Sequence, residues 1–409
     1  MSTTPQSPPW VLDQTLHHYI QRSKRARERE GESAEMEGEV KNFIKVWIVV
    51  MASLCYCYYA VARIRGGMLR LLYLLPIFYL FTILPLTLHT FHFGVTTTFF
   101  LVWLGNFKLL LFAFNQGPLS PPPPNLFHFI SIACLPIKIK QDPTLNKDHK
   151  PLNTRNGKNP SYQKAKNSKQ SSPNLETPSN PLTTKVSRSI LFLIKALLLA
   201  MIVRAYDNRP NLHPSVILAL YCGHLYLGVE IILALAAAPA RAIFGFELEP
   251  QFNEPYLATS LQDFWGRRWN LMVTSILRPT VYNPTRRVSA RVVGPRWASL
   301  PAVLATFLVS GLIHEVVYYY ATRANPTWEV TWFFVLHGLC VVIEIVVKKA
   351  VMDRWQLHRA ISGPLTIGFV AVTGAWLFFP QLLRSHLDDK IIHESSILMA
   401  FISWPLYKL

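Results

Sequence analysis

The stretch PAVLATFLVSGLIHEVVYYYA, residues 301–321, is long and apolar enough to cross a lipid bilayer, yet it carries a histidine, His314, well inside it. A membrane-spanning helix needs about 20 mostly apolar residues. A titratable side chain at that depth is costly, and by default it marks a functional site. The alternative is a histidine that only hydrogen-bonds to a neighbouring helix, and position alone does not separate the two.

The helical spacing around His314 predicts which side chains accompany it. Residues four apart share a face of a helix, so Ser310, His314 and Tyr318 line one stripe. Glu315 points about 100° away from that stripe. The string HEVVY, residues 314–318, begins like the zinc-binding helix of metalloproteases, but Tyr318 stands where the second histidine must be. We therefore predict no metal site here.

Composition extends the membrane interpretation to the whole chain. Of the 409 residues, 51% are hydrophobic and only 16% are charged, which is too little polar surface for a water-soluble protein of this length. We predict an all-α polytopic membrane protein with about eight or nine transmembrane helices. The segments long enough to span lie near 43–62, 68–88, 92–114, 188–206, 214–238, 299–321, 329–348 and 363–383.

Four regions are expected along the chain. Residues 1–40 form a polar, disordered N-terminal extension, and 41–139 carry the N-terminal transmembrane helices. Within them the apolar piece 126–139 is too short to span, which suits a re-entrant or interfacial helix. Residues 140–187 are polar and basic and bury too little apolar surface to fold, so we predict a disordered loop. Residues 188–409 form a second transmembrane region, which holds His314.

The formal charge of +18 raises the possibility of nucleic-acid binding, but the positions of the charges argue against it. Lys and Arg gather between the apolar runs, where they suit anionic lipid headgroups and control topology. No nucleic-acid-binding motif accompanies them. The five cysteines are scattered and predict neither a disulfide framework nor a zinc ligand set. We therefore expect membrane lipids, and no nucleic acid, among the partners.

A second candidate site is the segment LQDFWGRRWNLMVTSILRPTVYNP, residues 261–284, which is amphipathic, aromatic and basic. One interpretation is a helix that lies at the membrane interface. A sharper hypothesis is that its arginines bind the phosphates of a nucleotide-bearing acyl donor, because guanidinium groups match phosphate geometry, while its asparagine faces the reacting centre. The side chains concerned are Trp265, Arg267, Arg268, Trp269, Asn270 and Arg278.

The segment FWGRRWN, residues 264–270, followed by an intramembrane histidine in SGLIHEVVYYY, residues 310–320, resembles the membrane-bound O-acyltransferase superfamily. More narrowly, it is similar to the plant wax synthases (long-chain-alcohol O-fatty-acyltransferases) and their sterol-acylating relatives. Further motifs similar to that plant subfamily are NFIKVW at 42–47, NFKLLLFAFNQGPLS at 106–120 and ISIACLPIKIK at 130–140. The resemblance runs from about Met36 to the C-terminus.

Carried over residue by residue, the resemblance implies that His314 is the catalytic histidine and that Asn270 ends the aromatic F-x-x-x-x-W-N motif. Arg268 stands where the triacylglycerol-forming relatives have a second tryptophan, and this departure fits the wax-synthase branch. The implied fold is a bundle of tilted helices around a catalytic tunnel, with 188–409 as the catalytic core. The residues then expected to bind substrate are Trp265, Arg267, Arg268, Trp269, Ser310 and Tyr318.

The resemblance implies transfer of a fatty acyl group from acyl-CoA to the hydroxyl of a long-chain alcohol, which forms a wax ester without a bound cofactor. His314 is expected to act as general base, and Asn270 to orient the donor or to stabilise developing negative charge. A sterol acceptor is the alternative, since nothing in the sequence sizes the tunnel. A lipid or ion transporter is a remote alternative, because internal repeats are missing. The expected location is the endoplasmic reticulum membrane, and the oligomeric state stays open.

Other polar residues inside apolar runs are weaker candidates. His337 and Glu344 are seven residues apart on the following span, so they share a helix face that is placed to support the site. The remaining candidates, each with a structural or interfacial alternative, are His89, His92, Asn106, Lys108, His224 and Glu230.

Overall fold

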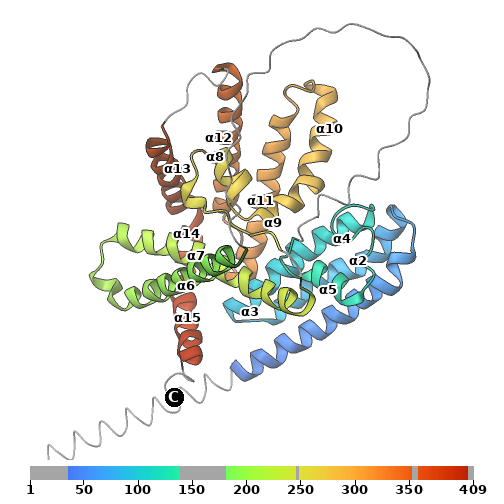
Figure 1. Ribbon diagram of the computed structural model, residues 1–409, viewed down its shortest axis with the longest axis horizontal. Helices are drawn as coiled ribbons and strands as arrows, with labels where there is room; N and C mark the ends of the chain where they lie inside the picture. The colour runs from blue at the N-terminus through green and yellow to red at the C-terminus, as the bar shows by residue number, and fades with distance from the viewer. Residues whose placement is uncertain (1–35, 139–180, 246–247, 352–357, 404–409) are drawn as a thin grey trace, which may run out of the picture. The chain divides into compact units, whose positions relative to one another are not determined.

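Helices make up the regular structure of the chain, as its apolar runs predict (Figure 1). A computed structural model describes residues 36–138, 181–245, 248–351 and 358–403, and no β-strand occurs among them. Inside a bilayer the backbone polar groups must be satisfied within their own segment, and a helix does this for all residues except those at its ends.

Eight helices among the described residues are long and apolar enough to span a membrane. They are Met36–Arg63, Met68–Thr87, Phe91–Ala113, Ser189–Asn211, Pro214–Phe244, Ser299–Thr322, Glu329–Ala350 and Arg359–Phe378. Each overlaps one of the eight segments predicted from the sequence. The prediction of an all-α polytopic membrane fold is therefore confirmed.

Two helix starts differ from the expected region boundaries. Of the predicted extension, 1–35 lies outside the described residues, whereas 36–40 are already helical. Of the predicted basic loop, 140–180 lies outside them, whereas α6 (Pro181–Ala205) includes the remaining residues. A helix continues past its apolar stretch wherever the flanking polar residues do not break it, and apolar length alone does not locate such an end.

The described residues divide into two units. One consists of those within Met1–Ile137 and Pro250–Leu409, and the other of those within Lys138–Glu249. His314 and the segment 261–284 both belong to the first unit. All the residues predicted to form the site therefore lie in one unit.

The second unit is a pair of long helices, α6 and α7 (Pro214–Phe244). Lys195 of α6 forms an ion pair with Glu230 of α7, with Nζ 2.6 Å from Oε1. His224 of α7 lies with Nδ1 3.3 Å from the Tyr206 hydroxyl. The polar residues of these two spans thus pair with one another, as groups placed in lipid must.

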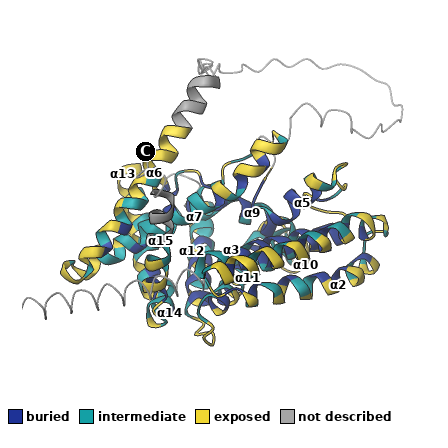
Figure 2. Cartoon of the chain, turned by 90° about the horizontal axis from the view of Figure 1, so that it is seen from below, coloured by how far each residue is buried: buried dark blue, intermediate teal, exposed yellow. Residues whose placement is uncertain are grey.

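Large apolar side chains are exposed along the spans, as contact with lipid requires. On α2 (Met68–Ile83), Leu72 and Tyr79 are 58% and 69% exposed, whereas Leu74 and Phe81 are fully buried. Figure 2 shows the same division, with exposed residues in yellow along one side of α2. One face of this helix therefore packs on protein while the other is left for lipid.

The third span is built from three consecutive helical elements: α3 (Phe91–Thr98), the π-helical η3 (Phe99–Gly105) and α4 (Asn106–Ala113). A π-helical stretch interrupts the ordinary hydrogen-bond register, and such interruptions are frequent at functional sites. At its end Gly105 packs closely on α2, since a Cβ there would lie 3.3 Å from ring carbons of Phe81.

Lys108 of α4 is fully buried and caps a short helix, α5 (Leu126–Cys134). Its Nζ lies 2.6 Å from the carbonyl oxygens of both Ile132 and Leu135. The last carbonyls of a helix have no partner within it and attract a cation. Lys108 therefore does not snorkel to the interface, which was one of its predicted roles. The nine residues of α5 are too few to span a membrane, as expected.

From residue 250 onward the first unit has a series of short elements followed by long helices. The elements are η6 (Pro255–Leu257), α8 (Leu261–Asp263), η7 (Phe264–Arg268), α9 (Leu271–Leu277), η8 (Arg278–Tyr282), α10 (Asn283–Val292), α11 (Ser299–Thr322), α12 (Glu329–Val351), α13 (Arg359–Thr373), η9 (Gly374–Phe378), α14 (Pro380–Arg384) and α15 (Leu387–Ser403). The interpretation of 261–284 as one interfacial helix is wrong. Trp269 is extended and Asn270 is left-handed with φ 38°, which ends helix η7 before α9 begins.

Two glycines bring α11 and α12 close together, and the two helices lie side by side (Figure 1). A Cβ on Gly311 of α11 would lie 3.0 Å from the backbone Cα of Thr331. A Cβ on Gly338 of α12 would lie 2.8 Å from Cβ of Phe307. Small residues at such contacts let membrane helices approach closely. Gly311 precedes His314 by about one turn. The contact at Gly311 therefore also determines which part of α12 lies opposite the histidine.

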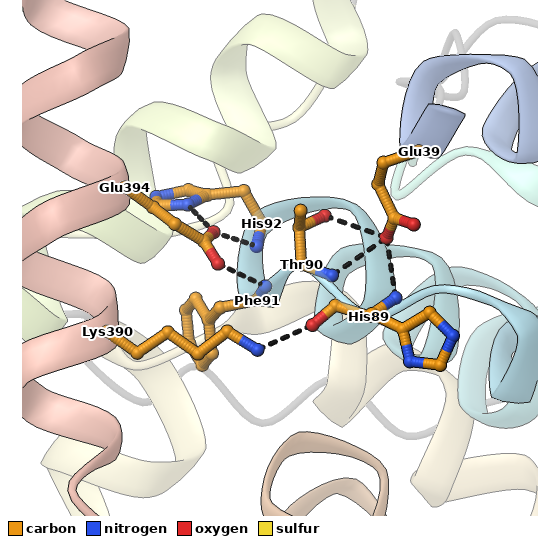
Figure 3. A network of polar contacts seen from close by, with 7 residues as sticks. All are labelled: Glu39, His89, Thr90, Phe91, His92, Lys390 and Glu394. Atoms are coloured by element: carbon orange, nitrogen blue, oxygen red, sulfur yellow. Dashed lines mark hydrogen bonds and ion pairs between the residues drawn. The ribbon is translucent and has the colours of Figure 1, made fainter. Parts of the chain in front are cut away.

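Glu39, on the first helix, caps the N-terminus of α3 (Figure 3). Its Oε1 accepts the backbone N–H groups of His89 and Thr90, at 2.5 and 2.7 Å. Amide groups before and within the first turn of a helix have no helical partner, and a carboxylate satisfies them while it complements the helix dipole. The His89 side chain takes no part in this cap and is exposed.

Glu394 of α15 approaches the same N-terminus from the other side (Figure 3). Its carboxylate accepts the backbone N–H groups of Phe91 and His92, at 2.8 and 3.0 Å, and lies 2.7 Å from the His92 ring nitrogen Nδ1. Lys390 donates to the His89 carbonyl at 2.5 Å. The first helix, α3 and α15 are thereby joined at one point.

We expect Gly311→Val to destabilise the protein by about 1–3 kcal/mol, because the added side chain meets backbone of α12 that cannot rotate away. The measurement is the thermal midpoint in detergent together with the amount of protein in membranes. Gly368→Val is the matched control, since Gly368 is also inside a spanning helix but has nothing within 4 Å of an added Cβ. Equal midpoints for the two variants would contradict the close contact of α11 and α12.

The Glu394 cap predicts a pH-dependent contribution to stability. Burial works to raise the pKa of this carboxyl, but the hydrogen bonds from the His92 ring and from the two backbone amides outweigh it and leave the pKa below its ordinary value. The contribution is then complete above the pKa of the unfolded chain, about 4.3. It is lost as the pH falls through the lower folded-state pKa.

We therefore expect Glu394→Gln to lower the thermal midpoint at pH 7, by an amount equivalent to about 1.5–3 kcal/mol for a charged hydrogen-bond acceptor. The difference from the wild type should shrink below about pH 4. Glu37→Gln is the control, because Glu37 pairs only with Lys41 and both side chains are exposed. A difference that persists unchanged at pH 3 would contradict the carboxylate's role.

Candidate active site

His314 is held by a hydrogen bond to its own helix. Its Nδ1 lies 2.7 Å from the backbone carbonyl oxygen of Ser310, one turn earlier in α11. A carbonyl oxygen only accepts hydrogen bonds, so the proton of the neutral imidazole is on Nδ1. Nε2 then carries a lone pair and no proton, which is the state that a general base needs. The helix backbone thus sets the tautomer.

Three aromatic rings from three other elements surround this imidazole. Phe334 of α12 lies nearest, with ring centroids 4.3 Å apart. Trp103 of η3 meets it edge to face at 5.3 Å, and Phe378 of η9 lies at 6.1 Å. His314 itself stays partly accessible. The imidazole therefore has an apolar surround, and the residue is not fully buried.

Ser310 and Tyr318 share the stripe of His314, as the spacing predicts, and the structure shows how each is engaged. Ser310 supplies its carbonyl oxygen to the imidazole. Tyr318 donates its hydroxyl to the carbonyl of Phe378 at 2.7 Å, and its ring lies 5.6 Å from the ring of Phe378. Both residues thus position the surroundings of His314, and a direct contact of either with substrate stays a prediction.

Glu315 faces α12 and not the stripe of His314, in agreement with the offset expected on a helix. Its Oε1 accepts from the backbone N–H and the hydroxyl of Thr331, each at 3.2 Å. The side chain is 4% exposed. Among the described residues no group of three or more His, Cys, Asp or Glu side chains is arranged to hold a metal ion.

Asn270 occupies the break between η7 and α9. Its backbone is left-handed, with φ 38° and ψ 67°, a conformation that asparagine tolerates better than most residues. Its Oδ1 accepts the N–H of Val273 at 3.4 Å and so caps α9. A polar Asn directly before the apolar run LMVTSIL, residues 271–277, is a sequence signal for such a cap.

Arg268 is tied into the loop that carries Asn270. Its Nε donates to Asp263 at 2.7 Å, and its Nη1 donates to the carbonyls of Asn253 and Glu254 at 3.2 and 3.3 Å. These contacts use most of its donors to fix the loop. Arg267 and Arg278 are exposed, and their side chains have no hydrogen bond or ion pair among the described residues. They are the freer candidates for a phosphate.

Trp265 is anchored by a buried histidine. Its indole Nε1 donates to His337 Nδ1 at 3.0 Å, and His337 Nε2 lies 2.8 Å from the Thr373 hydroxyl oxygen. Because Nδ1 accepts, the His337 proton is on Nε2. Glu344 reaches the same segment, where it accepts the N–H of Gln262 at 3.0 Å. His337 and Glu344 therefore share a supporting face, as predicted.

Aromatic rings connect Asn270 with His314. No hydrogen bond joins these two residues within the described structure. The ring of Trp269 lies 6.3 Å from that of Trp265, and Trp265 lies 5.6 Å from Phe334, which packs on His314. Whether Asn270 faces the reacting centre stays a prediction.

The three rings around His314 were not predicted from the sequence. Residues 103, 334 and 378 lie in three different elements, and no linear pattern connects them. Trp103 alone carried a signal, because tryptophan in membrane helices favours the interface and this one lies in the middle of an apolar span.

The fold and the site define an integral, multi-pass membrane protein with a histidine, His314, held between its helices. Residues 248–336 match the membrane bound O-acyl transferase family. The chain is 50% identical to a long-chain-alcohol O-fatty-acyltransferase from Simmondsia chinensis, over 90% of this chain and 97% of that protein. It is 41% identical to an acyl-CoA–sterol O-acyltransferase from Arabidopsis thaliana, over 88% of this chain and 96% of that protein. The chain therefore belongs to the wax synthase family of membrane-bound O-acyltransferases.

We expect Trp265→Phe to destabilise the protein by about 1–3 kcal/mol, because it leaves the fully buried Nδ1 of His337 without a donor. The thermal midpoint in detergent measures this. Trp332→Phe is the control, since Trp332 is 61% exposed on the same helix, α12, as His337. If the two variants unfold at the same temperature, the hydrogen bond between Trp265 and His337 does not contribute as the structure indicates.

Proposed function

We propose that this protein transfers a fatty acyl group from acyl-CoA to the hydroxyl of a long-chain alcohol and so forms a wax ester. The observation that carries the chemistry is His314, whose Nδ1 is bound to a carbonyl and whose Nε2 is left as a base inside an apolar surround. The choice of substrates follows the similarity to the Simmondsia enzyme.

The reaction balances with one base and no covalent intermediate. The alcohol oxygen attacks the thioester carbonyl carbon, and its proton passes to Nε2 of His314 as the C–O bond forms. The C–S bond then breaks, the ester is released, and the proton held by His314 is available to the departing CoA thiolate. Because the imidazole returns to its neutral tautomer, the carbonyl of Ser310 keeps its hydrogen bond throughout.

Asn270 is proposed to orient the acyl donor. Its Oδ1 is used in capping α9, and the rings of Trp269, Trp265 and Phe334 extend between it and His314. This arrangement suits a residue that holds the acyl donor and these aromatic rings in place. It suits a residue that acts directly on the reacting carbonyl less well.

The exposed Arg267 and Arg278 are proposed to bind the CoA phosphates, which a planar, always-charged guanidinium recognises well. The acyl chain and the alcohol then occupy apolar surroundings beside His314, so each part of the substrates stays in the solvent that suits it. A tunnel between the helices and a location in the endoplasmic reticulum membrane belong to the same proposal.

A sterol acceptor is the second candidate, favoured by the 41% identity with the sterol O-acyltransferase. Both acceptors are apolar alcohols with one hydroxyl, and both need the same base. Isolated membranes supplied with labelled acyl-CoA and either a long-chain alcohol or a sterol separate the two candidates. We expect wax ester as the main product, and a preference for the sterol would reverse the assignment.

We expect His314→Ala to lower kcat by about 10²-fold or more, the usual contribution of a general base, without loss of protein from the membrane. His89→Ala is the matched control, because the His89 side chain is exposed and only its backbone makes contacts in the α3 cap. Ester formation by His314→Ala at the rate of the control would refute the assignment of the base.

A further inference from the structure

The proposed mechanism leaves one charge without a partner. When the alcohol attacks, the thioester carbonyl oxygen becomes negative, and enzymes usually stabilise this charge with a positioned hydrogen-bond donor. Of the three described rings that contact His314, Phe334 and Phe378 have no polar atom. The third, Trp103, has an indole N–H.

The Trp103 N–H is buried and has no acceptor. The residue is 3% exposed, and Nε1 has no hydrogen-bond partner in the described structure. More than nine in ten buried polar groups in proteins are paired, and each exception calls for an explanation. An indole nitrogen is a donor only, so its missing partner must be an acceptor.

A second unpaired atom lies three residues further along the same span. Oδ1 of Asn106, at the start of α4, is also buried without a partner. Trp103 itself belongs to the π-helical η3, and such interruptions are frequent at functional sites. With the Thr97 hydroxyl of α3, this otherwise apolar span has three buried polar atoms without a partner in or beside its distorted stretch.

We propose that the Trp103 indole N–H donates a hydrogen bond to the thioester carbonyl oxygen and stabilises the negative charge that develops on it. This rests on the proposed role of His314. With the attacking oxygen within hydrogen-bond reach of His314 Nε2, the thioester carbonyl is about 3–3.5 Å away in a reactive arrangement. Trp103, in edge-to-face contact with the same imidazole, is in place to reach that carbonyl oxygen.

Trp103→Phe tests the inference, because phenylalanine keeps an aromatic ring and removes the N–H. We expect kcat to fall about 10²-fold, as for the loss of one oxyanion donor, with KM for both substrates nearly unchanged. The thermal midpoint should fall only by the packing cost of the smaller ring, because the lost N–H had no partner in the protein. The pH profile of kcat should keep its shape, since no titrating group is altered.

Trp47→Phe is the matched control. Trp47 also has a buried Nε1 without a partner, but it belongs to the first helix and its described ring contact is with Phe43. We expect wild-type kcat from this variant. A kcat for Trp103→Phe equal to that of the control would overturn the inference.

A changed pH profile in Trp103→Phe would also overturn it, because Trp103 would then act through His314 and not on substrate. The His314→Ala variant distinguishes this inference from the proposed function. If His314→Ala retains activity, the base assignment fails whatever Trp103 does. If His314→Ala is inactive and Trp103→Phe has wild-type kcat, only the inference about Trp103 fails.

Discussion

The hydrogen bond between Nδ1 of His314 and the carbonyl of Ser310 is the interaction on which the site depends. A neutral imidazole carries its proton on one ring nitrogen, and the hydrogen bond made by the ring determines which one. A carbonyl four residues earlier on the same helix accepts from Nδ1 and so fixes the tautomer. Any movement of α11 as a body carries donor and acceptor together, and Nε2 stays without a proton.

The packing around this histidine is set by contacts between α11 and other parts of the chain. Gly311 and Gly338 bring α12 close enough for Phe334 to lie 4.3 Å from the imidazole. The N-terminal cap made by Glu39 and Glu394 holds the start of the span that carries Trp103. The aromatic surround is therefore assembled from distant parts of the chain, and each part is fixed by a polar contact or a close backbone approach.

Local features of this protein could be predicted from the sequence, whereas contacts across the chain could not. Apolar length predicted the eight spans, and four-residue spacing placed Ser310, His314 and Tyr318 on one face. The break at Asn270 was missed, because a left-handed residue between two helical turns leaves the amphipathic pattern intact. The positions of Trp103 and Phe378 beside His314 depend on how η3 and η9 pack on α11, and sequence periodicity contains no information on that packing.

His337 and His314 show how one residue type can have two different roles. His337 accepts at Nδ1 from Trp265 and faces the Thr373 hydroxyl through Nε2, so both nitrogens are used and the ring is fully buried. His314 uses only Nδ1 among the described contacts, and the residue is not fully buried. A histidine with both nitrogens paired has no lone pair to offer a substrate, whereas one with a single backbone bond does. The number of hydrogen bonds that each imidazole makes therefore distinguishes the supporting histidine, His337, from His314, the proposed base.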